Sequence, residues 1–382
     1  MRIEEHQPLG QRTTLGVGGP ARFAAEIAAE AEIPEAVAWA RGRGLAWLAW
    51  GAGSNLLVSD AGFGGLAAHI ALRGVRFGDG GEVEAAAGED WDALVAACVA
   101  RGWAGIECLS GIPGTVGATP VQNVGAYGQE VGEVLERVRA WDTQREAWVE
   151  LGAKECGFGY RASRFNGADR GRFVVASVTL RLRPGGAATV RYPELQRWLG
   201  HLLLAPPSRW SGCGRASIPG NGRPLALGAS SSCRVRLGGG ATSLEATRAA
   251  VVALRRSKGM VLDAADPDSR SAGSFFKNPI VAEADVETIA RAAGEEPPRF
   301  AAGDGQVKVP AAWLIERAGF ARGFRIEGSR ARLSSKHVLA IVNDGGASAA
   351  EVEALARRIQ DAVAGRFGVE LQREPEGVGS GG

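Results

Sequence analysis

The spacing of hydrophobic and polar residues predicts helices and strands mixed along the whole chain. In residues 90–99, Trp91, Leu94 and Val95 recur at helical spacing and share one apolar face. Residues 173–182 end in an apolar–polar alternation that is typical of a strand. Other expected strands are residues 21–25, 45–50, 138–141 and 146–151, and other expected helices are residues 32–39, 193–199 and 242–258. This mixture predicts an α+β fold.

Cap signals predict where the C-terminal helices begin. Thr242 with Glu245, and Ser348 with Glu351, have the spacing of a capping box. Pro310 is suited to the first position of another helix, because its fixed φ matches helical geometry. We interpret His337 as a structural histidine at the start of a strand.

Residues 111–128 form the most unusual stretch of the sequence. They contain five glycines and two prolines and no charged residue. Such a run is neither an ordinary helix nor a central strand, and apolar anchors such as Ile112 and Val116 argue against a flexible linker. A rigid loop whose amide N–H groups face a pyrophosphate or an isoalloxazine ring fits this composition. A purely structural cluster of turns fits it equally well.

A second glycine-rich loop follows the strand expected at residues 45–50. Gly51 and Gly53 open the backbone, and Ser54 and Asn55 offer hydrogen-bond donors to a pyrophosphate. A Rossmann fingerprint would need a third glycine that opens a helix, whereas residues 56–58 are strand-like. A flavin site here would therefore be built from loops.

Composition and charge exclude several other classes of function. The 382 residues favour two or three domains, and the formal net charge of +2 provides no bulk field for nucleic acid or a membrane. We expect neither a signal peptide nor a membrane-spanning helix. The five cysteines lack metal-ligand spacing, so we expect no metal site and reduced thiols in the cytoplasm.

The order of residues in the 111–128 loop resembles the FAD-binding loop of UDP-N-acetylenolpyruvoylglucosamine reductases. Similar motifs cover residues 13–23, 51–60, 160–161, 271–279, 303–320, 334–343 and 367–379. The resemblance implies a non-Rossmann FAD-binding domain with two lobes, followed by a smaller α+β substrate-binding domain whose tail returns to the active site. The implied boundaries are residues 1–72 and 73–185 for the lobes, 186–240 for a connection and 241–382 for the substrate domain.

The resemblance also implies the residues of the site. Non-covalent FAD is expected to contact the two glycine-rich loops, at Gly51, Gly53, Ser54, Asn55, Leu56, Gly111, Pro113, Gly114, Gly117, Asn123, Gly125, Ala126 and Tyr127. The substrate is expected to contact Tyr160, Lys277 and Asn278. The expected catalytic residues are Arg161, Ser274 and Glu374.

The activity implied by the resemblance is the NADPH-dependent reduction of the enolpyruvyl ether of UDP-N-acetylglucosamine to UDP-N-acetylmuramate, a peptidoglycan precursor. Arg161 is suited to the substrate carboxylate, because a planar guanidinium binds a carboxylate through two hydrogen bonds. Ser274 would protonate the C2 carbon, and Glu374 would stabilise the enolate. If residues 372–373 are an insertion, Glu376 takes the place of Glu374.

Two other functions are alternatives to the reductase activity. A flavin oxidase of the related superfamily often tethers FAD through His or Cys, and neither glycine-rich loop contains a His. A binding module without catalysis would lack one of the three catalytic residues. Residues 201–240 contain no Asp or Glu and five Arg, so we interpret them as an insertion without effect on the chemistry. We expect a cytoplasmic monomer whose partners are NADPH and a UDP-sugar.

Overall fold

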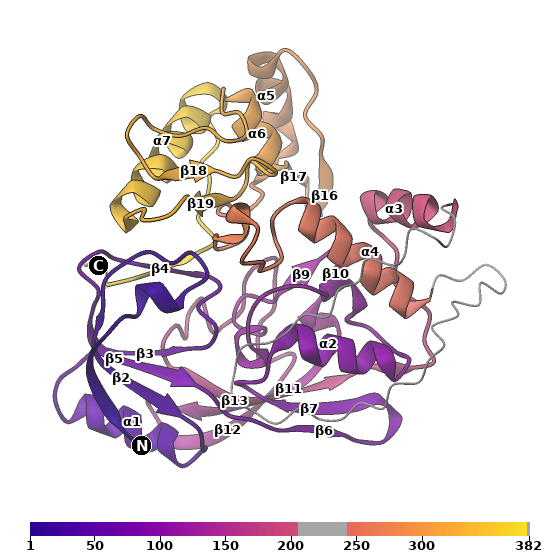
Figure 1. Ribbon diagram of the computed structural model, residues 1–382. Coiled ribbons are helices and arrows are strands. Elements are labelled where there is room, and N and C mark those ends of the chain that lie inside the picture. The colour runs from indigo at the N-terminus through magenta and orange to yellow at the C-terminus, as the bar shows by residue number, and fades with distance from the viewer. Residues whose placement is uncertain (205–242, 380–382) are drawn as a thin grey trace.

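The computed structural model describes residues 1–204 and 243–379 (Figure 1). The insertion expected at residues 201–240 lies, beyond residue 204, outside the described residues. Helices and strands are mixed along the chain, as the hydrophobic pattern predicts. No helix in the two described segments is long and apolar enough to cross a membrane.

The N-terminal residues form a four-stranded sheet in the order β1-β2-β5-β3. The bounds are β1 Ile3–Gln7, β2 Ala21–Ile27, β3 Trp47–Trp50 and β5 Phe63–Ile70, with helix α1 at Glu32–Arg41. Strand β5 pairs in parallel with both β2 and β3, whereas β1 is antiparallel to β2. Ile33, Ala36 and Ala40 of α1 enter the same hydrophobic core as Leu66 and Ala68 of β5, so the helix covers the sheet.

A second, fully antiparallel sheet has the order β12-β11-β13-β7-β6. The bounds are β6 Val75–Phe77, β7 Glu82–Ala86, β11 Leu135–Asp142, β12 Ala147–Gly152 and β13 Phe173–Arg181. Helix α2, Trp91–Ala100, lies against this sheet (Figure 1). The side chain of its N-cap, Asp90, accepts a hydrogen bond from the Ala93 N–H. The apolar face predicted for this helix is buried, which confirms the periodicity argument.

Most of the C-terminal half packs around a separate hydrophobic core, to which its first helix does not contribute. Its elements are α4 Leu244–Ser257, β15 Ile280–Ala282, α5 Val286–Ala293, β16 Phe300–Gly303, β17 Gln306–Lys308, α6 Ala311–Arg317, β18 Ala331–Leu333, β19 Ile341–Asn343 and α7 Ala349–Phe367. The core joins α7 with α6 and with the β18–β19 hairpin. The capping box predicted at Ser348 and Glu351 is present at the start of α7.

Two local predictions for this half are wrong. The N-cap of α4 is Ser243 rather than Thr242, because the Ser243 hydroxyl accepts the Ala246 N–H. His337 lies in the turn between β18 and β19, ahead of the strand rather than at its start. At α4 the neighbouring residue was equally compatible with the local sequence pattern, whereas β19 begins only at Ile341, four positions after His337.

The C-terminal tail crosses back to the first half of the chain. Strand β20, Glu376–Val378, pairs in parallel with β4, Leu56–Val58, directly after the second glycine-rich loop. Among the remaining elements, helix α3, Pro193–Leu204, packs on α4. Two short strand pairs complete the fold: β8 Trp103–Ala104 with β14 Arg183–Pro184, and β9 Gly125–Ala126 with β10 Gln129–Glu130. The tail therefore brings residues 374–378 beside residues 54–58.

Candidate active site

A cleft lies where the two glycine-rich loops, the end of α4 and the C-terminal tail meet. Its empty volume, including the mouth that opens to solvent, is about 700 Å³. The lining residues that the sequence analysis named are Ser54, Asn55, Pro113, Gly125, Arg161, Ser274 and Glu374. The three expected catalytic residues, which come from three distant segments, therefore meet in one cavity.

The two glycine-rich loops are packed too closely to accept side chains at their glycines. A Cβ atom at Gly51 would lie 2.1 Å from Oγ1 of Thr115. Gly53 and Gly114 have φ angles of +63° and +148°, which L side chains rarely adopt. A Cβ at Gly114 would also lie 3.3 Å from Oγ of Ser54. The two loops therefore pack closely against each other at these glycines, and Ser54, Asn55, Pro113 and Gly125 reach the cleft wall, where backbone and small polar groups suit a flavin cofactor.

Asn55 connects the glycine-rich loops to the C-terminal tail. Its Nδ2 group donates to Oε1 of Gln122 over 2.9 Å and to the Glu374 carbonyl over 3.1 Å. The Asn55 carbonyl in turn accepts the Glu376 N–H over 2.9 Å. One side chain therefore sets the distance between the cofactor loops and the tail carboxylate.

Asn123 holds the 111–128 loop against the turn that carries Arg161. Its side-chain oxygen accepts the Gly132 N–H, and its Nδ2 group donates to Glu130 and to the Gly159 carbonyl. The Asn123 side chain is therefore engaged with protein and supports the loop from behind. Arg161 itself has φ of +50°, a strained value for a residue with a side chain.

Arg161 and Glu374 lie side by side in the cleft wall. Arg161 Nε lies 3.0 Å from Oε1 of Glu374. The N–H is not aligned with that oxygen, so Arg161 Nε is buried without a hydrogen-bond partner among the described residues. Burial raises the pKa of the Glu374 carboxyl, and the opposing charges of Arg161 and Lys277 do not cancel that effect. The pair is close in space but leaves hydrogen-bonding capacity for a ligand.

Ser274 is fixed to the tail by a backbone ladder. The Phe275 N–H donates to the Leu339 carbonyl over 2.7 Å, and the Glu374 N–H donates to the Phe275 carbonyl over 2.9 Å. Phe275 and Phe276 are fully buried and anchor this ladder in the C-terminal core. Ser274 and Glu374 therefore lie on two neighbouring, hydrogen-bonded segments, although 100 positions separate them in the sequence.

The two candidate tail carboxylates occupy different surroundings. Glu374 lines the cleft. Glu376 lies in the paired strand β20, and its Oε1 atom is 2.8 Å from Nη2 of Arg170. The geometry therefore favours Glu374 over Glu376 as the carboxylate of the site.

The expected substrate residues lie behind or beside the cleft wall. Lys277 Nζ donates to the Arg161 carbonyl over 3.4 Å, and Oδ1 of Asn278 accepts the Ala311 N–H over 2.9 Å at the start of α6. The Tyr160 ring lies 4.5 Å from Nζ of Lys308. Asn278 thus satisfies the start of a helix through its oxygen.

The other expected cofactor residues lie in the loops without lining the cleft. This set is Gly51, Gly53, Leu56, Gly111, Gly114, Gly117, Asn123, Ala126 and Tyr127. Gly117 has a structural reason for lacking a side chain, because a Cβ there would lie 2.5 Å from Cβ of Ala87. The Tyr127 ring packs edge-to-face on Tyr192, with 5.6 Å between centroids.

Arg255 is a cleft residue that the sequence analysis missed. It lies in the last turn of α4, where Nε donates to the Gly111 carbonyl over 3.1 Å and Nη2 to the Met260 carbonyl over 2.9 Å. The neighbouring Arg256 is exposed. The two arginines have the same local sequence context, so only the packing of α4 identifies Arg255 as the one that faces the cleft.

The donor set suits an organic cofactor rather than a metal. Within residues 1–204 and 243–379 no cluster of His, Cys, Asp or Glu could hold a metal ion. The cleft wall of the described chain contains no His or Cys to which a flavin could be tethered. Cys98, Cys108 and Cys156 are free and buried, and burial raises the pKa of each thiol.

Comparisons with known proteins agree with this geometry. Residues 21–152 match the family model of an FAD binding domain, and residues 266–378 match that of the UDP-N-acetylenolpyruvoylglucosamine reductase C-terminal domain. The UDP-N-acetylenolpyruvoylglucosamine reductase of Nocardia farcinica is 46% identical, with 99% of this chain and 90% of the relative covered. The reductase of Saccharopolyspora erythraea is 44% identical, with 96% and 93% covered.

A solved structure gives the same result at the level of the fold. The crystal structure of UDP-N-acetylenolpyruvylglucosamine reductase from Thermus caldophilus superimposes with a TM-score of 0.61 at 25% identity, and 99% of each chain is covered. The α+β fold and the loop-built FAD-binding domain are thereby confirmed. The chain belongs to the UDP-N-acetylenolpyruvoylglucosamine reductase family.

Proposed function

We propose that this protein is an NADPH-dependent flavoenzyme that reduces the enolpyruvyl group of UDP-N-acetyl-3-O-(1-carboxyvinyl)glucosamine. The product is UDP-N-acetylmuramate, a precursor of peptidoglycan. Family membership supports the reaction. The observation that carries the assignment of residues is the convergence of Arg161, Ser274 and Glu374 on one cleft.

The two glycine-rich loops are proposed to hold FAD. Close packing at Gly51 and the positive φ angles of Gly53 and Gly114 bring backbone and the Ser54 side chain to the cleft wall. FAD held there would supply the hydride-transfer chemistry between NADPH and the β-carbon of the enolpyruvyl group. The residues of this chain bind and orient the substrate, stabilise its charge and supply its proton.

Arg161 is proposed to bind the substrate carboxylate. Its Nε–H is buried without a hydrogen-bond partner among the described residues, so a carboxylate in the cleft would satisfy a costly orphan donor. Arg255 adds a second positive charge to the same wall. As electrons move onto the carboxylate, these fixed charges stabilise the enolate more than the ground state.

Glu374, next to Arg161, is proposed to support the same charge in its neutral form. Burial raises the pKa of its carboxyl, so the proton is retained above the usual range for glutamate. A neutral carboxyl can donate a hydrogen bond to a carboxylate oxygen, whereas an ionised one would repel it.

Ser274 is proposed to protonate the C2 carbon of the substrate. Its hydroxyl is a weak acid, but an enolate carbon is a strong base, so the transfer has sufficient driving force. The backbone ladder to Phe275 and Glu374 fixes its position relative to the stabilising carboxyl. A monomer stays an expectation, and NADPH and a UDP-sugar as partners favour the cytoplasm.

The alternative function, a flavin oxidase with a covalent tether, has little support. The described part of the cleft has neither a His nor a Cys in its wall. The C-terminal half of the chain also matches the reductase family model through residues 266–378.

Ser274→Ala tests the proposed role by separating the two half-reactions. Stopped-flow absorbance of the flavin is recorded with NADPH, and separately with the enolpyruvyl sugar after anaerobic reduction. Reduction by NADPH should proceed at the parent rate, because Ser274 has no part in it. Reoxidation by the sugar should slow by at least ~10²-fold, which is the usual contribution of a positioned acid.

Two further variants control for indirect effects. Ser274→Cys should retain more reoxidation activity than the alanine variant, since a thiol can still give a proton. Ser257→Ala removes a hydroxyl at the end of α4 that bonds, within the described part of the chain, only the Leu254 carbonyl, and both half-reactions should keep the parent rate. An alanine variant at position 274 that reoxidises normally would remove Ser274 from the mechanism.

A further inference from the structure

The segment that carries Ser274 has little regular structure of its own. Between the end of α4 and Phe276 the only helical element is the 3₁₀ turn at Pro267–Ser269. This segment nevertheless supplies much of the cleft wall, through Gly259, Met260, Leu262, Ser269, Ser271, Ala272, Gly273 and Ser274. Contacts from outside the segment must therefore fix its shape.

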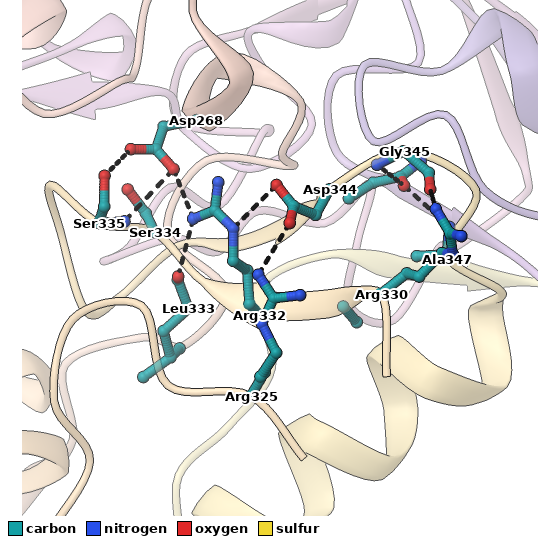
Figure 2. A network of polar contacts seen from close by, with 12 residues as sticks. Asp268, Arg325, Arg330, Arg332, Leu333, Ser334, Ser335, Asp344, Gly345 and Ala347 are labelled. Carbon is teal, nitrogen blue, oxygen red and sulfur yellow. Dashed lines mark hydrogen bonds and ion pairs between the residues drawn. The ribbon is translucent and has the colours of Figure 1, made fainter. Parts of the chain in front are cut away.

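A buried carboxylate, Asp268, provides one such contact. Its side chain is 2% exposed, and Oδ1 lies 2.7 Å from Nη1 of Arg332 in strand β18. Ser335 donates to the same carboxylate through its hydroxyl and its backbone N–H, as Figure 2 shows for the residues of this network. Burial by itself raises the pKa of Asp268, but the bonds from Ser335 and Arg332 outweigh it and leave the pKa lowered.

Arg332 is shared between two carboxylates. On the side away from Asp268, its Nε lies 3.1 Å from Oδ1 of Asp344, which also binds Arg325 over 2.8 Å (Figure 2). Arg332 is 7% exposed, whereas the Arg325 side chain is 45% exposed. The network therefore runs from the surface of the β18–β19 hairpin to the buried start of the segment that carries Ser274.

The hairpin also holds the segment after Asp268. The Asn343 N–H donates to the Arg270 carbonyl over 3.0 Å, and Ser271 forms a β-bridge with Val342. Beyond this bridge, Gly273 has φ of +73° and open space around it, so it offers little resistance to movement. Ser274 is therefore held from two sides, by the docking of residues 268–271 before Gly273 and by the hydrogen bonds of Phe275 after it, and a looser dock would leave only the second.

We propose that the Asp268–Arg332 ion pair positions Ser274 for proton delivery, an inference that rests on the proposed role of Ser274. A buried charge pair can be separated only by leaving an uncompensated charge, so it resists small displacements more strongly than backbone bonds alone. Asp268 and Arg332 do not line the cleft and act only through the segment. An offset of about 1 Å at a reacting group is enough to slow a reaction by up to ~10²-fold.

A double-mutant cycle with Asp268→Asn and Ser274→Ala tests this coupling. The Asn side chain keeps the volume and one acceptor oxygen, and Arg332 keeps its second carboxylate, so we expect the variant to fold. Asp268→Asn alone should slow flavin reoxidation by the enolpyruvyl sugar by about 10-fold. The rate of flavin reduction by NADPH should change by less than about twofold. When Ser274→Ala is already present, adding Asp268→Asn should lower the reoxidation rate by less than about a further twofold.

Asp344→Asn is the matched control within the same network. It weakens the outer partner of Arg332 and leaves the contact between Arg332 and Asp268 in place. We expect a lower unfolding temperature but reoxidation within about twofold of the parent. The proposal fails if Asp268→Asn slows both half-reactions equally. It also fails if the fold-losses in reoxidation rate caused by Asp268→Asn and Ser274→Ala multiply in the double variant, because Asp268 would then not act through Ser274.

Ser335→Ala gives a milder perturbation if Asp268→Asn does not fold. It removes one hydroxyl from the Asp268 carboxylate and should show the same dependence on Ser274, with about a threefold effect. The two hypotheses fail separately. Normal reoxidation by Ser274→Ala would refute the acid itself, whereas slow Ser274→Ala with normal Asp268→Asn and Ser335→Ala would refute only the positioning role.

Discussion

Two partly buried arginine–carboxylate pairs in this protein have opposite properties. In the second sheet, Asp142 binds Arg172 through both carboxylate oxygens, over 3.0 and 2.6 Å, and also accepts two backbone N–H groups. The hydrogen bonds from Arg172 lower the pKa of Asp142 to about 2 despite its burial. In the cleft, Glu374 lies 3.0 Å from Arg161, yet burial raises its pKa.

The difference comes from hydrogen-bond alignment rather than from distance. Every oxygen of Asp142 is satisfied by an aligned donor, so the ionised form is stabilised. The Nε–H of Arg161 does not point at Glu374 and has no other partner among the described residues. A satisfied pair stabilises the fold, whereas an unsatisfied pair in a cavity retains donors for a ligand.

The backbone of Arg161 shows the same contrast. Its φ of +50° lies in the left-handed region, which costs of order 1 kcal/mol for a residue with a side chain. Asn123 holds the preceding turn through the Gly159 carbonyl. The strained conformation is therefore maintained by the loop that is proposed to bind FAD.

The largest expected effect comes from Arg161→Lys. Lysine keeps a positive charge but loses the planar fork, so it cannot bind the substrate carboxylate through two aligned bonds. Flavin reoxidation by the enolpyruvyl sugar should slow by about 10³-fold, while reduction by NADPH stays near the parent rate. Single-turnover stopped flow measures both.

Arg164→Lys is the control for Arg161→Lys, because Arg164 lies three positions later and pairs with Asp169 over 2.7 Å away from the cleft. It should leave both half-reactions within a few-fold of the parent. If the two variants lost reoxidation equally, the distinction between a ligand-binding arginine and a structural one would be wrong for this turn.

The next effect concerns stability and comes from Asp142→Asn. The pKa of Asp142 is lowered to about 2 in the folded protein from its ordinary value of 3.8. Because the folded pKa is lowered, the pair stabilises the fold above the unfolded pKa, and that stabilisation disappears as pH falls through the folded value. The free energy of unfolding at neutral pH should drop by about 2 kcal/mol in the variant.

Denaturant unfolding from pH 7 to pH 2 checks this prediction. The difference between parent and Asp142→Asn should shrink as pH falls below about 4 and nearly vanish near pH 2. Both half-reactions of the folded variant should be normal. A difference that is independent of pH would mean that the loss reflects packing rather than the charge of Asp142.

The smallest effect separates the two tail carboxylates. Burial raises the pKa of Glu374, so the parent should lose reoxidation activity as pH rises through that value, while Glu374→Gln, which cannot ionise, should not. Their rates should differ by about 10-fold or less across this range. Glu376→Gln affects only a partly exposed pair with Arg170 and should keep the parental pH profile. Identical profiles for the parent and Glu374→Gln would show that Glu374 does not titrate in this step.

The sequence by itself determined the types of residue and most of the local structure. The hydrophobic periodicity located α2 and its buried face, and the capping box located the start of α7. The glycine pattern of residues 51–54 and 111–128 identified two loops that need backbone freedom. These features depend on neighbouring residues, whose interactions are set by the covalent order of the chain.

Tertiary structure decided everything that depends on contact between distant segments. Glu374 rather than Glu376 lines the cleft because the pairing of β20 with β4 begins only at Glu376, which contacts Arg170, whereas Glu374 precedes the strand and is bonded to Phe275. The packing of α4 places Arg255, and not Arg256, in the cleft wall. The proposed role of Asp268 depends on its contact with Arg332 in β18. Such choices are absent from local patterns because their free energy comes from burial and long-range pairing.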